Sequence, residues 1–489
     1  MASLNQTRRT APIFTHEGGR AAHDTPLNTL RRTVMTCMLW EDRFYEDGEA
    51  VADRIKRLVH SVSLEAAAQV AVEARNVMKL RHVPLLIVRE MARHPKRNTS
   101  KDLNAANHTS WISKTLAEII QRADELSEFL AIYWKDGKEP LSKQVKLGLA
   151  KAFQKFNEYD LAKYNRNKEV KLRDVLFLCH SKPADVNDER VWTKETRKLF
   201  DENPGAAQRR LLVQTGHGDG FTEGELLYGK LIYDQLETPD TWEVELSKNG
   251  NNANSWQRLL DEKKLGALAF LRNLRNMKAA GVSESDIKLY GDTSRWGRVL
   301  PFRFIAAARM NPSLEHVIEP WMLKCMENQP KLPGKTVFLV DVSGSMFGTK
   351  VSAKSDLDRF DAAAAIAVLG RELCEEVAVL SFSSNVVQVP ARRGFGLIDA
   401  INRSQGHNAT HLGRALDAVT QNPYDRIIVI TDEQSADTGR EKLHNTYIIN
   451  VGGYENSLKY EGEVTRISGW SESVFDFIQM LESEKSDKL

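Results

Sequence analysis

Hydrophobic residues in the first two thirds of the chain recur at helical spacing. Between residues 143 and 157, apolar side chains return every three or four positions and mark one buried face, formed by Val145, Leu149, Ala152, Phe153 and Phe156. Similar patterns predict helices at about residues 65 to 80, 84 to 94, 111 to 135, 170 to 180, 255 to 278 and 313 to 327. Little strand pattern separates them, so paired helices are the expected architecture. We find no strict repeat period, which leaves a divergent HEAT-like array open.

The pattern changes near residues 329 to 335, where two prolines and a glycine interrupt the chain. Downstream, continuously apolar runs predict strands at 336 to 340, 377 to 382, 386 to 389, 426 to 431 and 446 to 451. Helices are expected between and after them, near 358 to 374, 396 to 403, 411 to 421 and 472 to 483. This alternation predicts a doubly wound α/β fold, with a mostly parallel sheet covered on both faces. We therefore expect a helical domain over residues 1 to 330 and an α/β domain over residues 331 to 489.

Polar side chains follow two of the predicted strands, at the edge where open α/β sheets bind ligands. Asp341, Ser343 and Ser345 come directly after one apolar run, and Asp432 follows another. Thr410 lies in a loop of small residues between them. Together these residues offer two carboxylates and three hydroxyls, a set of oxygen ligands suited to Mg²⁺.

The same loop does not fit two other chemistries. A phosphate-binding loop needs the order Gly-x-x-x-x-Gly-Lys-Ser/Thr, but in Gly344-Ser-Met-Phe-Gly-Thr-Lys350 a threonine separates the glycine from the lysine. A hydrolase that forms a phosphoaspartate would need a second aspartate where Ser343 stands. His407 and His411, beside the predicted site, are interpreted as loop histidines. No nucleophile and base can be named as a pair elsewhere, so an enzyme is the least favoured class.

Composition bounds the remaining possibilities. With 489 residues, of which 42% are hydrophobic and 27% charged, the chain is typical of a soluble globular protein with two or more domains. It shows no apolar segment of signal-peptide or membrane-spanning length, which predicts a cytoplasmic location and no membrane partner. The cysteines form no Cys-x-x-Cys pair, so buried thiols are expected rather than disulfides or a zinc site. They are Cys37, Cys179, Cys325 and Cys374.

Charge is distributed unevenly between the two predicted domains. Lys and Arg outnumber Asp and Glu by 51 to 44 in residues 1 to 330 and are outnumbered by 17 to 22 in residues 331 to 489. The basic part favours polyanions and the acidic part favours a cation. Cations are densest from residue 163 to residue 182, where they could neutralise phosphates without reading bases, and binding of that kind weakens steeply with salt.

The Asp-x-Ser-x-Ser loop with the strand before it, the later Thr410, the strand end at Asp432 and the expected sheet topology together resemble the von Willebrand factor A fold with its metal-ion-dependent adhesion site. The resemblance implies that Asp341, Ser343, Ser345, Thr410 and Asp432 hold Mg²⁺ directly or through water. It also implies that an acidic group of a partner often completes the shell. The loop before Thr410 reads Gly-His-Asn-Ala, where relatives often have a pair of glycines.

Several segments of the helical part are similar to the TROVE module of the Ro autoantigen family. They are Leu27 to Arg32, Arg173 to Pro183, Trp256 to Leu260, Leu268 to Met277 and Leu300 to Arg303. Followed by an A-type domain, they cover nearly the whole chain. The resemblance implies a closed ring of HEAT-like repeats, sealed by the A domain. It further implies that the outer surface of the ring binds small structured RNAs of the Y class and that its hole takes single-stranded ends of misfolded RNA.

The RNA-contacting pattern of that family matches Lys163 and His180 and departs at Asn167, where a basic residue is expected. We expect the RNA-binding residues to be Lys163, Tyr164, Arg166, Lys168, Lys171, Arg173 and His180.

Two hypotheses of different classes follow. The first is a monomeric, non-enzymatic RNA-binding protein that captures small or misfolded RNAs for stabilisation, processing or quality control. An exoribonuclease or another acidic protein would dock at its metal site. The alternative is a Mg²⁺-dependent scaffold that recruits an acidic protein partner through the A domain, with RNA binding incidental.

Overall fold

The computed structural model describes most of the chain. The described residues are 25–36, 48–78, 80–97, 103–104, 109–165, 169–184, 223–299, 302–327, 329–350, 357–433, 435, 437, 442–452, 460–468 and 474–486. They form two compact units, of which the first combines Met1–Ile55 with Asn249–Leu489 and the second is Lys56–Lys248. The change from helices to alternating strands falls between Met326 and Leu332. The expected domain boundary at residue 330 stays a prediction.

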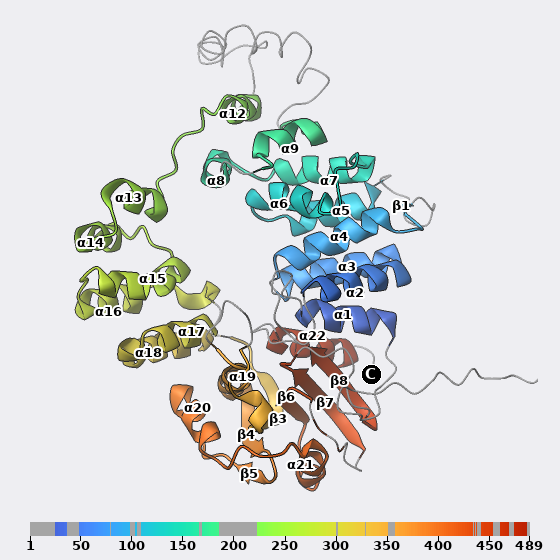
Figure 1. Ribbon diagram of the computed structural model, residues 1–489, viewed down its shortest axis with the longest axis vertical. Coiled ribbons are helices and arrows are strands. Elements are labelled where there is room, and N and C mark those ends of the chain that lie inside the picture. Colours follow the sequence, from blue (N-terminus) through green and yellow to red (C-terminus); the bar gives the residue numbers. More distant parts are fainter. Residues whose placement is uncertain are drawn as a thin grey trace, which may run out of the picture. The chain divides into compact units, whose positions relative to one another are not determined.

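Helices make up nearly all of the second unit. They are α3 (Leu64–Asn76), α4 (His82–Arg93), α5 (Trp111–Ile119), α6 (Asp124–Tyr133), α7 (Lys143–Phe153), α8 (Glu158–Tyr164), α9 (Leu172–Cys179), α12 (Glu223–Ile232) and α13 (Trp242–Asn249), and α2 (Gly48–Ser61) leads into them. A short hairpin, β1 (Leu103–Asn104) and β2 (Thr109–Ser110), was not expected. Figure 1 shows α3, α4, α5, α6 and α7 stacked together, with α4 against α3, α5 and α6, and α7 against α5 and α6. The apolar face predicted for residues 143 to 157 is confirmed, because all five of its side chains are buried.

The single helix predicted for residues 111 to 135 is wrong, because the chain breaks it between α5 and α6. The cause is the buried carboxylate of Glu125, which accepts hydrogen bonds from the backbone N–H groups of Gln121 (2.8 Å) and Arg122 (3.1 Å). Arg75 of α3 donates to the same carboxylate at 2.7 Å and balances its charge. A tertiary ion pair therefore stabilises the turn that ends one helix and begins the next.

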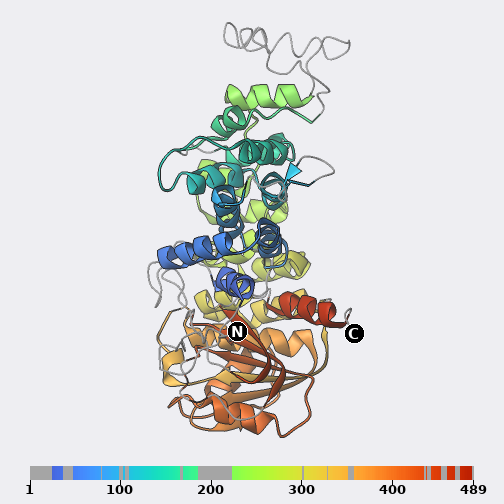
Figure 2. The same cartoon turned by 90° about the vertical axis from the view of Figure 1, so that its right-hand side faces the viewer.

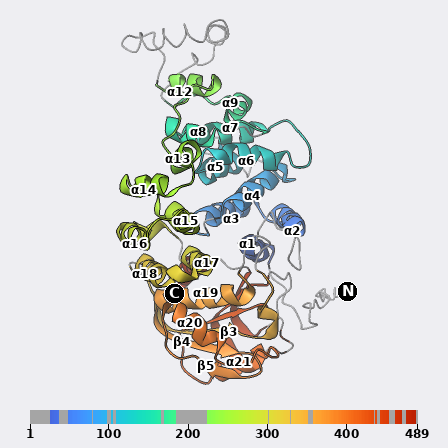
Figure 3. The same cartoon turned by 60° about the vertical axis from the view of Figure 1, so that its left-hand side comes forward.

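The first unit contains several helices before the sheet, namely α1 (Pro26–Thr36), α14 (Ala253–Asp261), α15 (Ala267–Ala279), α16 (Glu284–Thr293), α17 (Phe302–Met310) and α18 (Glu315–Met326), with short 3₁₀ turns at Trp296–Arg298 and Pro312–Leu314 (Figure 3). The single helix predicted for residues 255 to 278 is wrong. It is interrupted because Lys263 adopts a left-handed backbone conformation (φ 52°) and Gly266, in an extended conformation, caps the start of α15. Trp296 stacks on Trp321 with ring centroids 5.4 Å apart, and Gly291 leaves the space that Trp321 fills.

The six-stranded sheet also belongs to the first unit (Figure 2). Its strands are β3 (Leu332–Asp341), β4 (Cys374–Phe382), β5 (Val386–Gln388), β6 (Arg426–Thr431), β7 (Leu443–Asn450) and β8 (Gly462–Ser468), in the order β5-β4-β3-β6-β7-β8. Only β5 pairs antiparallel to its neighbour. A mostly parallel sheet at the expected strands is therefore confirmed, whereas β8 was not predicted.

Helices cover both faces of this sheet. They are α19 (Arg359–Leu373), α20 (Gly394–Asn402), α21 (Leu412–Val419) and α22 (Val474–Ser486). Alternate residues of β3 point to opposite faces. Leu339 packs in a buried cluster with Leu416 of α21, whereas Phe338 meets Gly370 of α19 and lies 6.3 Å from the ring of Phe475 in α22. The two-sided cover predicted from continuously apolar strands is present.

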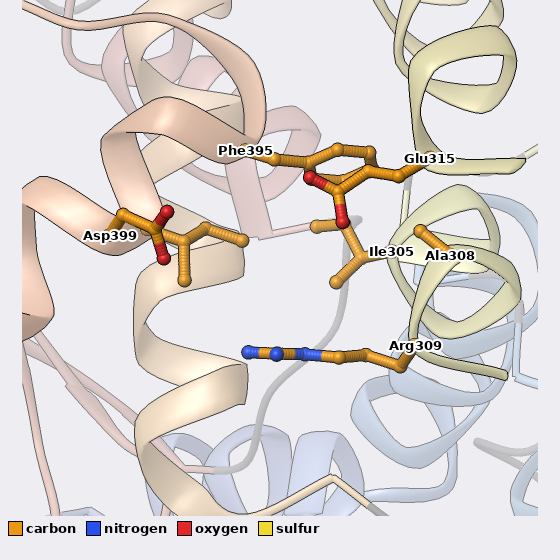
Figure 4. Close-up of a pocket in the computed structure, with 7 residues that line it drawn as sticks. Ile305, Ala308, Arg309, Glu315, Phe395 and Asp399 are labelled. Atoms are coloured by element: carbon orange, nitrogen blue, oxygen red, sulfur yellow. The ribbon is translucent and has the colours of Figure 1, made fainter. Parts of the chain in front are cut away.

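Helices α17 and α18 pack against the helices of the sheet. The Glu319 carboxylate accepts a hydrogen bond from the backbone N–H of Phe395 at 2.6 Å, and Gly394 adopts a positive φ of 56° there. A cavity between α17, α18 and α20 is lined by Ile305, Ala308, Arg309, Glu315, Phe395, Ile398 and Asp399. Figure 4 shows the Arg309 guanidinium reaching across it, toward α19, where it pairs with Asp361. The helices that precede the sheet are thus part of the same packed body as the sheet.

Three of the four cysteines lie in described residues, and all three are free and buried, as predicted. Burial raises the pKa of the Cys179 and Cys374 thiols to about 11. Cys37 lies outside the described residues. None of the helices that the structure describes is both long and apolar enough to span a bilayer.

Candidate metal centre and nucleic-acid interface

Asp341 ends β3 at the carboxyl edge of the sheet, and its side chain is fully buried. One carboxylate oxygen accepts a hydrogen bond from the Ser343 N–H (2.8 Å) and the other accepts one from the Thr431 hydroxyl (2.6 Å). Burial raises the pKa of Asp341, the nearby negative charge of Asp432 raises it further, and the result is about 7. The carboxylate therefore lies where negative charge is costly and where a cation would stabilise it.

The two serines of the loop gather their hydroxyls beside this aspartate. Ser343 is buried and Ser345 is half-buried, and their Oγ atoms lie 3.2 Å apart. Ser345 sits in a single 3₁₀ turn, Gly344–Met346, which reverses the chain directly after the strand. The tight turn thus brings both hydroxyls to the same side, as the Asp-x-Ser-x-Ser spacing predicts.

The loop that carries Thr410 is held against this turn by Ser383, which follows β4 at the same sheet edge. The Ser383 hydroxyl accepts from the Asn408 N–H (2.9 Å) and donates to the Ala409 carbonyl (3.0 Å). Gly344 N–H donates to the Asn408 carbonyl at 3.2 Å. The Thr410 loop is therefore held at this sheet edge by the Ser383 hydroxyl and by one backbone hydrogen bond.

Thr410 itself is half-buried, and its carbonyl accepts a hydrogen bond from the buried Ser435 hydroxyl at 3.2 Å. Among the described residues, its own hydroxyl makes no hydrogen bond to the other four predicted ligands. His407 stacks flat on Phe347, with ring centroids 4.0 Å apart, and so packs within the loops rather than presenting a ligand. Thr410 is near the site through its backbone, and its role as a ligand stays a prediction.

Asp432 follows β6 and is fully buried, as the sheet-edge argument requires. Its Oδ2 accepts a hydrogen bond from Nη1 of Arg359, the first residue of α19, at 2.8 Å. Both side chains have no exposed surface, so this is a fully buried ion pair. The prediction contained no cationic partner for this carboxylate.

The donors of the site suit a hard cation. They offer hydroxyl and carboxylate oxygens at one buried edge, where the Asp432 carboxylate pairs with the Arg359 guanidinium. No group of three or more His, Cys, Asp and Glu side chains in the described part of the chain could hold a metal ion. A cation here would depend on serine and threonine hydroxyls and on water, as Mg²⁺ tolerates better than zinc or copper does.

Three residues of this centre were missed by the sequence argument. Ser383 follows a predicted strand at the same edge, so the reasoning that selected Asp341 also applies to it. Ser435, which accepts from the Leu412 N–H (3.2 Å) and anchors the start of α21, follows β6 in the same way. Arg359 carries no such signal, because it reaches the site from a helix.

The predicted RNA-binding residues lie on and around α8 and α9 in the second unit. The Lys163 ammonium lies 5.7 Å from the ring of Tyr159 and 5.8 Å from that of Tyr164. The Arg122 guanidinium lies 4.9 Å from the same Tyr164 ring. These four residues form one continuous row of alternating cations and aromatic rings, which we call the cation–aromatic row. Tyr159, 49% exposed, and Arg122 were not predicted, although Tyr159 and Lys163 are spaced four residues apart on α8.

The remaining predicted residues are more widely spread. Arg173 approaches Asp234 at 3.7 Å, and Asn165 donates to the same carboxylate at 3.3 Å, which links the end of α8 to the start of α9. Lys171 and His180 flank α9 at opposite ends, about 13 Å apart along the helix. Exposed His180 adopts a left-handed conformation with φ 53°. Arg166 and Lys168, and the departure at Asn167, lie outside the described residues.

Comparison with known proteins places part of this chain in a family. The TROVE domain matches residues 230–329, from α12 to α18. Telomerase protein component 1 of Rattus norvegicus and that of Mus musculus are each 39% identical over 79 residues. That stretch is 15% of this chain and only 3% of either relative.

The fold as a whole has a solved counterpart. The crystal structure of the Deinococcus radiodurans RO (RSR) protein aligns with a TM-score of 0.56 and 15% sequence identity, covering 93% of this chain and 100% of that one. At this identity the likeness concerns the fold. The TROVE match and the telomerase component add sequence similarity within the helical part. Residues 230–329 of this chain therefore match the TROVE domain, and its fold is similar to that of a Ro protein.

Proposed function

We propose that this chain is an RNA-binding protein without catalytic activity, which captures RNA on the surface formed by α8 and α9. The observation that carries the proposal is the cation–aromatic row. Lys163 has no ion-pair partner among the described residues, and the exposed Tyr159 ring beside it is free to stack on a base. Phosphate contacts from Lys163, Lys171, Arg173 and His180 would position the RNA, and the rings would add stacking that tolerates any sequence.

We propose the RNA class and the architecture from the resemblance to the Ro family. We propose that the helical part forms a HEAT-like ring with a C-terminal von Willebrand factor A domain. Small structured Y-like RNAs would bind on its surface, and single-stranded ends of misfolded RNA would enter its hole. The outcome for the RNA would be stabilisation, processing or quality control. The protein would act as a cytoplasmic monomer.

The metal centre would serve docking rather than catalysis. Asp341, Ser343, Ser345, Thr410 and Asp432 would hold Mg²⁺ directly or through water, and the bound ion would supply a positive docking point for a carboxylate. An exoribonuclease or another protein with an exposed acidic group is the proposed partner. The donor set supports this, because it offers oxygen ligands only.

Titration with a small structured RNA at several salt concentrations tests the leading proposal. We expect tight binding at low salt and a linear fall of log K with log salt. Absence of binding at low salt, or a response that does not change with salt, would refute it.

The alternative function is a Mg²⁺-dependent protein scaffold. The oxygen donors at the carboxyl edge of the sheet favour it. Under it, Asp341→Ala or chelation abolishes capture of an acidic protein partner, while Lys163→Gln leaves capture unchanged. Under the leading proposal, Lys163→Gln weakens RNA binding and Asp341→Ala leaves RNA binding unchanged. A pair of binding assays on these two variants therefore separates the functions.

A further inference from the structure

Helix α19 brings Arg359 to one carboxylate of the proposed metal centre, and its backbone is fixed there. Arg359 N–H donates to the Thr349 carbonyl at 3.1 Å. The preceding residue, Asp358, caps the helix by accepting from the Asp361 N–H at 2.8 Å. With the helix start held on both sides and the side chain fully buried, the guanidinium cannot leave Asp432 without disrupting the cap or the core.

Charge at this edge is only partly balanced. The Arg359 guanidinium contributes one positive charge at this edge. Its bond to Asp432 Oδ2 offsets the charge of that carboxylate, whereas the hydrogen bonds that the described residues donate to Asp341 come from neutral groups, the Ser343 N–H and the Thr431 hydroxyl. A buried carboxylate without an opposite charge is costly, so the site still attracts a cation. The same guanidinium repels one.

We propose that Arg359 is a built-in counter-ion that competes with the divalent cation for Asp432 and thereby weakens the affinity of the metal centre. The inference rests on the metal site proposed above. In this account Arg359 offsets the charge of one of the two buried aspartates at this edge. The counter-ion role also implies that filling the site requires a higher free Mg²⁺ concentration than it would without Arg359, because the ion must enter against a fixed positive charge.

Arg359→Met removes the charge while keeping a long apolar side chain, and Arg359→Lys keeps the charge. Isothermal titration calorimetry with MgCl₂ on the full chain, together with thermal unfolding with and without MgCl₂, measures the effect. We expect Arg359→Met to bind Mg²⁺ at least about tenfold more tightly than the unchanged protein. Its Tm should also rise more on adding Mg²⁺. Arg359→Lys should bind as the unchanged protein does.

The other possible results for Arg359→Met also support or overturn the proposal. If Arg359→Met folds only when Mg²⁺ is present, the ion replaces the lost charge and the proposal is supported. If it fails to fold in both conditions, Arg359→Gln, which keeps a donor for Asp432 without the charge, takes its place with the same expected gain. Equal Mg²⁺ affinity in the neutral variant and the unchanged protein overturns the counter-ion role but leaves the metal site standing. If neither the neutral variant nor the unchanged protein binds Mg²⁺, the metal site itself is refuted.

Discussion

Replacing Lys163 and Tyr159 separately should affect RNA binding in two different ways. Lys163 supplies one cation without an ion-pair partner among the described residues, so Lys163→Gln removes one phosphate contact at most. For duplex RNA regions we take the slope of about 0.9 per contact known for B-DNA. Raising the salt concentration from 50 to 200 mM weakens RNA binding by both proteins. The factor by which it weakens binding should be about 3.5-fold smaller for the variant than for the unchanged protein.

Tyr159→Ala should lower affinity without changing that slope. The ring carries no charge, and its 49% exposed surface offers a stacking face worth about 1 to 3 kcal/mol per base, or about 5- to 150-fold in affinity. Tyr159→Phe keeps the ring and should bind as the unchanged protein does. Both positions lie on α8, whose start is stabilised by the Asn157 and Asp160 capping box, so neither change should unfold the helix.

Fluorescence anisotropy with a labelled small structured RNA at four or more salt concentrations measures both effects. Lys138→Gln is the matched control, because it removes a lysine of the same unit that also lies near an aromatic ring, 5.9 Å from Trp134, but outside residues 158 to 182. The reasoning fails if Lys163→Gln keeps the full slope. It also fails if Lys138→Gln reduces the slope as much, since the effect would then reflect net charge and not the cation–aromatic row.

Three further predictions concern other parts of the chain. Glu482→Gln should lower the free energy of unfolding by about 3 kcal/mol, because it leaves the buried Arg426 guanidinium without its bidentate carboxylate. Burial of Glu482 raises its pKa, but the hydrogen bonds and charge of Arg426 outweigh burial and lower the pKa below 4.5. The stability that the ion pair contributes is therefore present above pH 4.5 and is lost as the pH falls through the lower pKa of the folded protein. Urea unfolding between pH 7 and pH 3 should show that the variant loses less free energy of unfolding on acidification than the unchanged protein does. Gly291→Ala should destabilise by about 2 to 3 kcal/mol in denaturant melts, because the added Cβ would lie 2.0 Å from a ring carbon of buried Trp321; an unchanged midpoint would show that the tryptophan moves freely. Asp341→Asn, or EDTA, should leave RNA affinity within about twofold, since the cation–aromatic row lies in the other compact unit; a larger loss would mean that metal and RNA sites are coupled.

The strands of the sheet could be predicted because buried parallel strands are apolar on both faces. The run at residues 426 to 431 coincides with β6, and all six of its residues are buried. Strand β8 was not predicted, because its sequence is not continuously apolar. It lies at the sheet margin and reads Gly-Glu-Val-Thr-Arg-Ile-Ser, so polar side chains interrupt its apolar run. Edge strands carry a weaker hydrophobic pattern because one side of them is less enclosed.

Helix ends were predicted less well than helix existence. The break between α5 and α6 depends on Glu125 capping backbone groups and on Arg75, which lies 50 residues earlier in the chain. Helical periodicity continues through that break, because the residues on either side still face one core. A local pattern records which face is buried, but it contains no information on a distant ion pair that stops the helix.

The metal centre shows the same division between local and distant information. Asp341, Ser343 and Ser345 are fixed relative to one another by a strand end and a single tight turn, so their spacing alone predicts that their oxygens converge. Affinity for a cation depends instead on all charges around those oxygens, including one carried by Arg359 on a helix. The motif therefore specifies where an ion would bind, and a residue outside the motif determines how strongly. Similar Asp-x-Ser-x-Ser loops should differ in metal affinity according to the charge of the residue that faces the second aspartate.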